Sequence, residues 1–286
     1  MVCESARMTE PSIDAVAILG CGTMGAAILG GALQAGVFTP ELVTVTGRRT
    51  ERVQPIAERF GVTATTDNVA AVRASSTVIL CVKPQLAKKV LTAPGLADAL
   101  DGKLLVSICA GTRLSQLHAW VPGASLIRAM PNTPSVIGAG MTVLSPGHGA
   151  TETDIARVER IFAAVGRCRV LDEQYLDAVT ALSGSGPAFA CVIIEALADG
   201  GVMMGLPRDV AVELAAQTVL GAGRLVLETG THPAALKDSV TTPAGCTIAG
   251  LLIMEDGRIR STLARTIQEA TLVASGLGGP DEEPAS

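Results

Sequence analysis

The sequence has few aromatic residues and no excess of positive charge. Among its 286 residues there are one Trp, one Tyr and four Phe, and the net charge is −5. So few rings give nucleic-acid bases little to stack on, and an acidic chain has no basic surface for phosphate backbones. We therefore expect no nucleic-acid partner, and a core built from Ala, Val, Leu, Ile and Gly.

Long apolar runs and targeting signals are also missing. The charge-free apolar runs are shorter than the ~18 residues that a spanning helix needs. The uncharged stretch 129–151 contains three prolines and Asn132, which predict a loop and a strand. The N-terminus, with Glu4, Arg7 and Glu10, lacks the apolar segment of a signal peptide. We expect a cytoplasmic protein that does not enter a membrane.

Metal-ligand patterns and paired cysteines are absent as well. The seven cysteines include no C-x-x-C pair, and the three histidines (His118, His148 and His232) show no metal-ligand spacing. These features predict reduced, mostly buried thiols, surface histidines and no metal site.

What the sequence does have is an apolar run that breaks into glycines. Residues Ala15–Leu19 are typical of a strand buried on both faces, and Gly20, Gly22 and Gly25 follow at G-x-G-x-x-G spacing. In this pattern the first glycine makes a tight turn, the second admits a pyrophosphate, and the third lets the next helix pack closely. The helix predicted over 23–35, with Gly36 as its stop, would direct free N–H groups at the phosphates. We predict a dinucleotide-binding turn.

Strand and helix patterns alternate after this turn. Helices are predicted over 50–60, after Asp67-Asn68, and from the Thr151–Asp154 cap to Val165, with Gly166 ending the last one. Predicted strands cover 42–46, 62–65, 77–82, 104–108, 125–128 and 141–144. Because ligands lie beyond the carboxyl ends of such strands, Val82, Lys83, Ala110 and Gly111 should line a cofactor groove.

The second strand is followed by Gly47, Arg48 and Arg49. An NAD-preferring domain usually has an acidic residue here for the ribose 2′-hydroxyl, whereas arginines suit a 2′-phosphate. The pattern favours NADPH, with NADH as an alternative donor; two solvated arginines at a helix start are the other interpretation.

Strand-like runs stop near residue 172. Helices are predicted over 172–182, 187–200, 207–227 and 256–275, and the second is apolar around its whole circumference. We therefore predict an α/β Rossmann domain with a parallel sheet, followed by an all-α domain that is buried in a dimer. The expected divisions are a disordered lead 1–14, the Rossmann domain 15–171, a helical dimerisation and substrate domain 172–277, and a flexible tail 278–286.

Six motifs occur in the order and spacing of one family. They are Gly-Cys-Gly-Thr-Met-Gly (20–25), Cys-Val-Lys-Pro-Gln (81–85), Met-Pro-Asn-Thr-Pro (130–134), Leu-Ser-Gly-Ser-Gly-Pro-Ala-Phe (182–189), Ala-Asp-Gly-Gly-Val-Met-Met-Gly-Leu-Pro (198–207) and Leu-Lys-Asp-Ser-Val-Thr-Thr-Pro-Ala-Gly-Cys-Thr (236–247). Over about residues 15–275 the sequence resembles the pyrroline-5-carboxylate reductases.

The resemblance implies the last step of proline synthesis, in which NAD(P)H reduces the C=N bond of 1-pyrroline-5-carboxylate to give L-proline. It also implies an interleaved dimer, often five dimers in a decamer, and an active site where the cofactor domain meets the helical domains.

The resemblance assigns roles to individual positions. Thr247 would be catalytic, and Thr242, Gly245, Cys246, Thr247 and, with least support, Glu173 would bind the substrate. The cofactor would be bound by Leu19, Gly20, Gly22, Thr23, Met24, Gly25, Gly47, Arg48, Arg49, Asn68, Val82, Lys83, Pro84, Ala110, Gly111 and Ser239.

The sequence departs from the family in the substrate loop, where Ala244 replaces a glycine and Cys246 a Thr or Ala. A Cβ at residue 244 disfavours positive φ, so the loop must shift if the family requires it, and Cys246 could confer sensitivity to thiol reagents.

Two other classes of function stay open: another imine or β-hydroxyacid reductase of the same plan, and a non-catalytic NADP-binding regulator. A catalytic Lys would mark the hydroxyacid enzymes, and no Lys occurs between Lys103 and Lys237.

Overall fold

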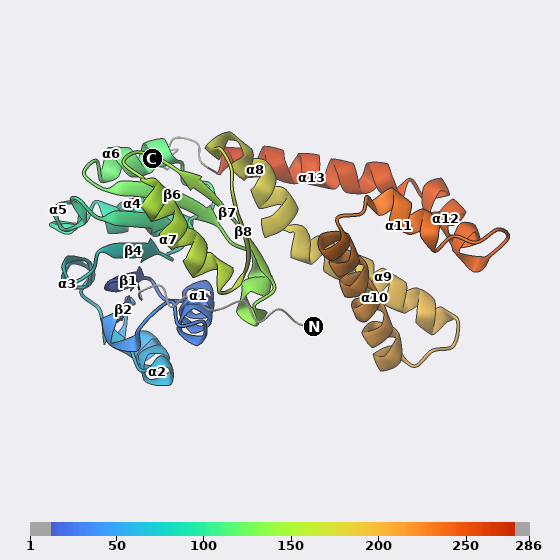
Figure 1. Cartoon of the computed structure of the whole chain (residues 1–286), viewed down its shortest axis with the longest axis horizontal. Coiled ribbons are helices and arrows are strands. Elements are labelled where there is room, and N and C mark those ends of the chain that lie inside the picture. The colour runs from blue at the N-terminus through green and yellow to red at the C-terminus, as the bar shows by residue number, and fades with distance from the viewer. Residues whose placement is uncertain (1–12, 278–286) are drawn as a thin grey trace, which may run out of the picture. The chain divides into compact units, whose positions relative to one another are not determined.

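The computed structural model describes residues 13–277, which divide into two compact units (Figure 1). The first unit extends to Gly184 and resumes at Thr271, and the second covers Ser185–Ala270. The division at 171/172 expected from the sequence stays a prediction, and most of the expected lead and tail lies outside the described residues.

A twisted sheet forms the centre of the first unit. Over residues 13–277 its strand order is β3-β2-β1-β4-β5-β6-β7-β8, and neighbours pair in parallel except for the antiparallel pair β6–β7. The strands are β1 (Val16–Leu19), β2 (Val43–Thr46), β3 (Thr63–Thr65), β4 (Thr77–Leu80), β5 (Leu104–Ser107), β6 (Ser125–Met130), β7 (Gly140–Pro146) and β8 (Gly166–Val170). The order reverses at β1, as in doubly wound dinucleotide-binding sheets, so the predicted fold class is confirmed.

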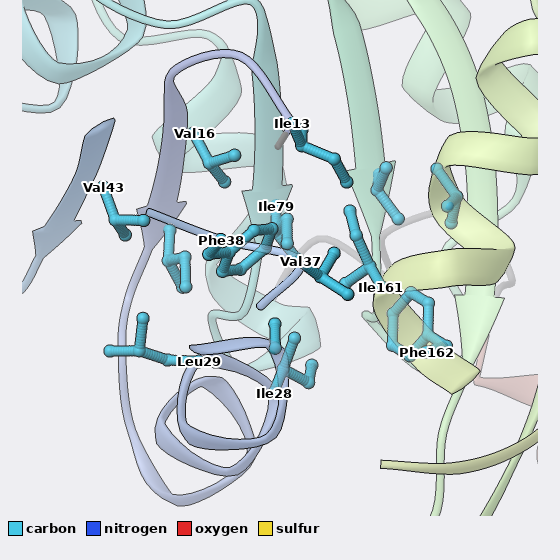
Figure 2. Packing of buried hydrophobic residues seen from close by; sticks show 14 of the residues in the cluster. Ile13, Val16, Ile28, Leu29, Val37, Phe38, Val43, Ile79, Ile161 and Phe162 are labelled. Carbon is cyan, nitrogen blue, oxygen red and sulfur yellow. The ribbon is translucent and has the colours of Figure 1, made fainter. Parts of the chain in front are cut away.

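Helices cover both faces of the sheet and enclose two apolar clusters. On one face, Ile28 and Leu29 pack with Ile161 and Phe162 over the central strands (Figure 2). The second cluster combines β4 and β5 with the helices that follow them. The helices of this unit are α1 (Thr23–Gln34), α2 (Thr50–Phe60), α3 (Asn68–Arg73), α4 (Pro84–Leu91), α5 (Leu96–Leu100), α6 (Leu114–Trp120), α7 (Glu152–Ala163) and α8 (Leu176–Val179).

The sequence pattern missed strand β8. Gly166 was expected to end a helix, but α7 ends at Ala163 and Gly166 begins the strand, paired with Gly140. A Cβ on Gly166 would lie 2.0 Å from the Gly140 carbonyl oxygen. The two backbones therefore approach too closely for any other residue, and the glycine serves this contact instead of a helix stop.

The helix predicted over 172–182 is present but irregular. The segment forms a 3₁₀ turn at Glu173–Tyr175, the short helix α8 and a π-turn at Thr180–Gly184. A π-turn contains an extra residue per turn, which apolar periodicity does not reveal.

The second unit is helical, as expected. It contains α9 (Gly186–Met203), α10 (Arg208–Thr229), α11 (Pro233–Ser239), α12 (Cys246–Asp256) and most of α13 (Ile259–Gly276). Two segments, Glu173–Met203 and Arg208–Thr229, are long and apolar enough to cross a membrane by length and composition alone. Both segments contain charged side chains, for example Glu195 and Glu213, so neither is a charge-free run of that length.

A single copy of the second unit has few buried apolar side chains. Its core cluster consists of Ala198, Ala211 and Ala215, while larger side chains on the same helices, such as Leu197 and Leu214, are at least half exposed. Three alanines cannot provide the burial that stabilises a domain. These helices therefore need a further surface to cover them.

The cysteine and histidine side chains lie partly as expected. Among the described cysteines, Cys191 and Cys246 are exposed, while the other four are buried or partly buried. His148 and His232 are exposed as expected, but His118 is half-buried against His148, with 4.4 Å between their ring centroids. No group of three or more metal-ligating side chains occurs among the described residues.

Candidate functional site

The turn between β1 and α1 uses its three glycines for three different reasons. Gly20 has a φ of +80°, and a Cβ there would lie 2.5 Å from Val82 Cγ1. A Cβ on Gly25 would come within 3.3 Å of both Cys21 Sγ and Ile18 Cγ2, whereas one on Gly22 would meet nothing closer than 4.0 Å. Gly20 is thus required by the turn and Gly25 by packing, and Gly22 leaves open space beside the backbone. A pyrophosphate fits at such a position.

The first turn of α1 offers free backbone donors next to this space. Gly22 is the N-cap, no side chain caps the helix, and Gly22 and Thr23 are exposed. Uncapped N–H groups at the start of a helix of this length are suited to an anion. Leu19 is buried at the end of β1 and Met24 packs against the core, so these two residues contact the core side of the turn.

Arg48 and Arg49 follow β2 and are both exposed. Among the described residues, neither guanidinium group has a hydrogen-bond or ion-pair partner; the Arg49 carbonyl accepts from Arg52 N–H at 3.1 Å. Arg49 is the N-cap of α2, and Gly47 packs against Val53, where a Cβ would lie 3.1 Å from the Val53 Cβ. Two unengaged guanidinium groups at the end of β2 suit a phosphate on the adenosine ribose.

The remaining predicted cofactor residues of this unit follow β3, β4 and β5. Asn68 begins α3, and Lys83 and Pro84 begin α4. Ala110 and Gly111 form the turn after β5, where Gly111 has a φ of +76° and packs against Leu277 at the end of α13. The topology thus brings these segments to the same carboxyl edge of the sheet as the glycine turn.

Three neutral thiols surround the glycine turn. Burial raises the pKa of Cys21 to about 12 and that of Cys109 to about 11. Burial also raises the pKa of Cys81 well above its usual value, with smaller contributions from the neighbouring Cys21 and Cys109. These side chains are protonated at neutral pH, so they add no negative charge beside an anionic cofactor.

The predicted substrate loop lies in the second unit and forms a tight turn. The Gly245 N–H donates to the Thr242 carbonyl at 3.1 Å, and α12 begins directly afterwards at Cys246. The N-cap residue is Gly245, so no side chain caps the first N–H groups of α12. Thr247 is half-buried at the second helical position. Ala244 has a φ of 54°, so it adopts the left-handed conformation despite its Cβ. The loop keeps a conformation that glycine would favour.

Two predicted site residues make contacts of their own. The Ser239 hydroxyl donates to the Leu236 carbonyl at 2.7 Å, which leaves only its oxygen lone pairs for a ligand. Glu173 Oε1 accepts from Leu114 N–H at 2.7 Å and from Arg128 Nη1 at 3.0 Å, and Arg128 is 3% exposed. The Glu173 carboxylate therefore neutralises a buried guanidinium, and its role as a substrate ligand stays a prediction.

Two polar residues that the sequence analysis did not assign to the site make hydrogen bonds between separate segments of the first unit. The Asn132 amide donates to the Ser183 carbonyl at 3.2 Å, and its Oδ1 accepts from Met141 N–H at 2.8 Å, which ties the 130–134 loop to the π-turn. The Thr46 hydroxyl contacts both Gly20 and Asn68. Asn132 lies in the Met-Pro-Asn-Thr-Pro motif, but no signal in a single sequence marks Thr46.

Comparisons with known proteins agree with this arrangement. A family model described as pyrroline-5-carboxylate reductase dimerisation matches residues 173–277, and one described as NADP oxidoreductase, coenzyme F420-dependent, matches residues 15–111. A pyrroline-5-carboxylate reductase of Schizosaccharomyces pombe is 44% identical over 277 residues, which cover 91% of this chain and 98% of that protein.

Solved structures give the same result. The structure of a pyrroline-5-carboxylate reductase from Coxiella burnetii has a TM-score of 0.88 at 32% identity and covers 94% of this chain and 100% of its own. A pyrroline carboxylate reductase of Plasmodium falciparum with NADP bound has a TM-score of 0.83 at 28% identity, covering 93% and 98% of the two chains.

Replacing Glu173 by Gln tests whether this residue is structural. We expect the free energy of unfolding, measured in urea, to fall by about 1–3 kcal/mol, because Arg128 loses the nearer of its two carboxylate partners and keeps only Asp177, at 3.9 Å. Glu228→Gln, in the exposed pair with Arg224, should change it by less than about 0.5 kcal/mol. Unchanged stability with a large rise in the KM for the imine substrate would instead make Glu173 a substrate ligand.

Replacing Ala244 by Gly tests the strain in the substrate loop. Removal of the Cβ at a positive φ should raise the free energy of unfolding by about 0.5–1 kcal/mol, after allowance for the greater freedom of glycine in the unfolded chain. Ala249→Gly, at an exposed helical position in α12, should lower it by about 1 kcal/mol. Equal losses in the two variants would contradict the left-handed conformation at residue 244.

Proposed function

The chain belongs to the pyrroline-5-carboxylate reductase family, and from this premise we propose that it reduces 1-pyrroline-5-carboxylate to L-proline with NADPH. The observation that carries the proposal is the presence, in one chain, of an open glycine turn with free N–H donors and of the turn at Thr242–Thr247. The first suits a dinucleotide and the second an anionic substrate. NADH is an alternative donor.

The reaction requires little acid–base chemistry from the protein. The imine is protonated on its nitrogen, and its carbon accepts a hydride. The C=N π electrons become the nitrogen lone pair, and the nitrogen keeps its proton. The bound cofactor supplies the hydride from its nicotinamide ring. The protein therefore contributes mainly position and exclusion of water.

Thr247 is the residue proposed to hold the ring nitrogen. Its side chain is half-buried in the first turn of α12, and a hydroxyl can accept a hydrogen bond from the imine N–H. The Gly245 N–H already donates to Thr242, so the other backbone N–H groups of the 242–247 turn are proposed to bind the substrate carboxylate, as turns with a left-handed residue commonly do for anions. Cys246 is exposed at the same helix start and is proposed to line the site.

The cofactor is proposed to lie along the carboxyl edge of the sheet. The turn of Gly20, Gly22 and Gly25 would take the pyrophosphate, while Arg48 and Arg49 would take the 2′-phosphate. Asn68, Val82 and Ala110 would line the rest of the groove, as the sequence predicts. The open space at Gly22 and the free arginines support this placement.

The chain self-associates through its dimerisation region, and we propose a dimer, with a decamer of five dimers as the larger assembly. Because the second unit buries only three alanines in its own cluster, a second copy would supply the missing core. This burial also accounts for the apolar helices α9 and α10 without a membrane. A cytoplasmic location is part of the same proposal.

No observation favours a second function. A β-hydroxyacid reductase would need a catalytic Lys, and none occurs between Lys103 and Lys237. A non-catalytic regulator would be free to lose the substrate loop, but the loop retains Thr247 and its turn. Ala244 and Cys246 alter the loop sequence without removing the left-handed residue.

Steady-state oxidation of NADPH with DL-pyrroline-5-carboxylate tests the reaction and the role of Thr247. Thr247→Val removes the hydroxyl at nearly constant shape, and we expect kcat to fall about 10²–10³-fold, as when one preorganised hydrogen bond is lost. Thr247→Ser should retain most of the activity, and the Kd of NADPH should be unchanged in both. Turnover within twofold of wild type in Thr247→Val would refute the assigned role.

The ratio of NADPH to NADH turnover tests the arginines. In the double variant Arg48→Gln, Arg49→Gln, the KM for NADPH should rise about 10–100-fold, because charge-assisted hydrogen bonds to the 2′-phosphate are lost. The KM for NADH, which lacks that phosphate, should stay within twofold. An equal rise for both cofactors would mean that the arginines serve the fold and not the phosphate.

A further inference from the structure

Thr46, the last residue of β2, contacts two separate parts of the proposed cofactor site. It is 1% exposed, and its carbonyl oxygen accepts the N–H groups of Gly20 at 3.2 Å and Cys21 at 2.9 Å. Its hydroxyl oxygen lies 3.3 Å from Gly20 N and 2.6 Å from Asn68 Oδ1. One buried residue thus joins the glycine turn to the start of α3.

The chemistry of these contacts fixes the direction of each hydrogen bond. Gly20 N–H can only donate, so the Thr46 oxygen accepts from it, and the Asn68 carbonyl oxygen can only accept, so the Thr46 hydroxyl hydrogen points to it. If the Asn68 amide were reversed, both its NH₂ group and the Gly20 N–H would point at the Thr46 hydroxyl oxygen. The buried hydroxyl hydrogen of Thr46 would then lose this acceptor, which is costly.

The orientation of the amide determines what Asn68 offers to a ligand. With Oδ1 occupied by Thr46, its NH₂ group is the free end, and among the described residues no acceptor bonds to it. An NH₂ group attracts the oxygens of an anionic dinucleotide, whereas an amide oxygen in the same place would repel them. The Thr46 hydroxyl thus selects the polarity of the Asn68 side chain.

We propose that Thr46 is a positioning residue for NADPH: its hydroxyl holds the Asn68 amide with the NH₂ group toward the cofactor and steadies the glycine turn at Gly20. The proposal rests on the proposed cofactor function and adds to it a residue that makes no contact with the cofactor. Thr46 acts through Asn68, so loss of its hydroxyl weakens NADPH binding and leaves the chemistry of the reducing step intact.

The test is the Kd of NADPH, measured by titration calorimetry, together with kcat at saturating NADPH. Thr46→Val should raise the Kd at least tenfold, which corresponds to about 1.4 kcal/mol, with kcat within twofold of wild type. Thr46→Ser keeps the hydroxyl and should bind NADPH within threefold of wild type. Thr44→Val makes the same change two residues earlier on β2 and should leave the Kd unaltered.

Variants of Asn68 provide a second test, which is needed if Thr46→Val is too unstable to purify. Asn68→Asp keeps an oxygen for the Thr46 hydroxyl but replaces the NH₂ group by a carboxylate oxygen, so NADPH binding should weaken more than tenfold while the melting temperature changes little. In an Asn68→Ala background, Thr46→Val should weaken NADPH binding much less than it does alone, because the two changes remove the same Thr46–Asn68 hydrogen bond.

The outcomes separate this proposal from the proposed function. Normal NADPH affinity in Thr46→Val or in Asn68→Asp overturns the role of Thr46, and so does full additivity of Thr46→Val and Asn68→Ala. A wild-type protein that binds NADPH but does not reduce the imine overturns the proposed function alone. A wild-type protein that does not bind NADPH overturns both.

Discussion

The close approach of the β1–α1 turn to its neighbouring strands is the constraint on which the cofactor half of the molecule depends. Gly20 lies against Val82 after β4 and against Thr46 at the end of β2, and no Cβ can be placed between the backbone and Val82. Because the turn is held from both sides, α1 starts at a defined position with its first N–H groups uncapped. The free donors and the open space at Gly22 lie at the position that this packing defines, and Thr46 links the same turn to Asn68.

A different constraint governs the second unit, which lacks a core of its own. Its helices carry many large apolar side chains, yet the buried cluster of one copy contains only alanines. Apolar area removed from water is the main source of folding free energy, so these helices gain stability only when a further surface covers them. Self-association is therefore part of how this unit folds, and the proposed substrate loop at 242–247 joins helices that are stabilised in that way.

Much of this arrangement could be predicted from the sequence, and the failures have physical causes. The strands from β1 to β7 and the glycine turn were accessible because buried strands and G-x-G-x-x-G leave local patterns. Strand β8 was not, since Gly166 looks like a helix stop and its true reason is contact with Gly140, distant in sequence. The π-turn at Thr180–Gly184 and the ion pair of Glu173 with Arg128 likewise depend on partners that periodicity cannot show. Candidate site residues came from the family motifs, which omit supporting residues such as Thr46.

Backbone strain by itself does not identify the functional loop. Among the described residues, Ala244 and Arg258 are the non-glycine residues with positive φ, at 54° and 55°. Arg258 lies in the two-residue connection between α12 and α13, directly after Gly257. Ala244 has the same conformation, but it lies in a turn whose N–H groups precede a helix without a side-chain cap and whose next residues include Thr247. The same conformational cost of about 1–2 kcal/mol therefore has different meanings at the two positions. Arg258 joins two helices, whereas Ala244 lies in the loop that is proposed to bind the substrate carboxylate.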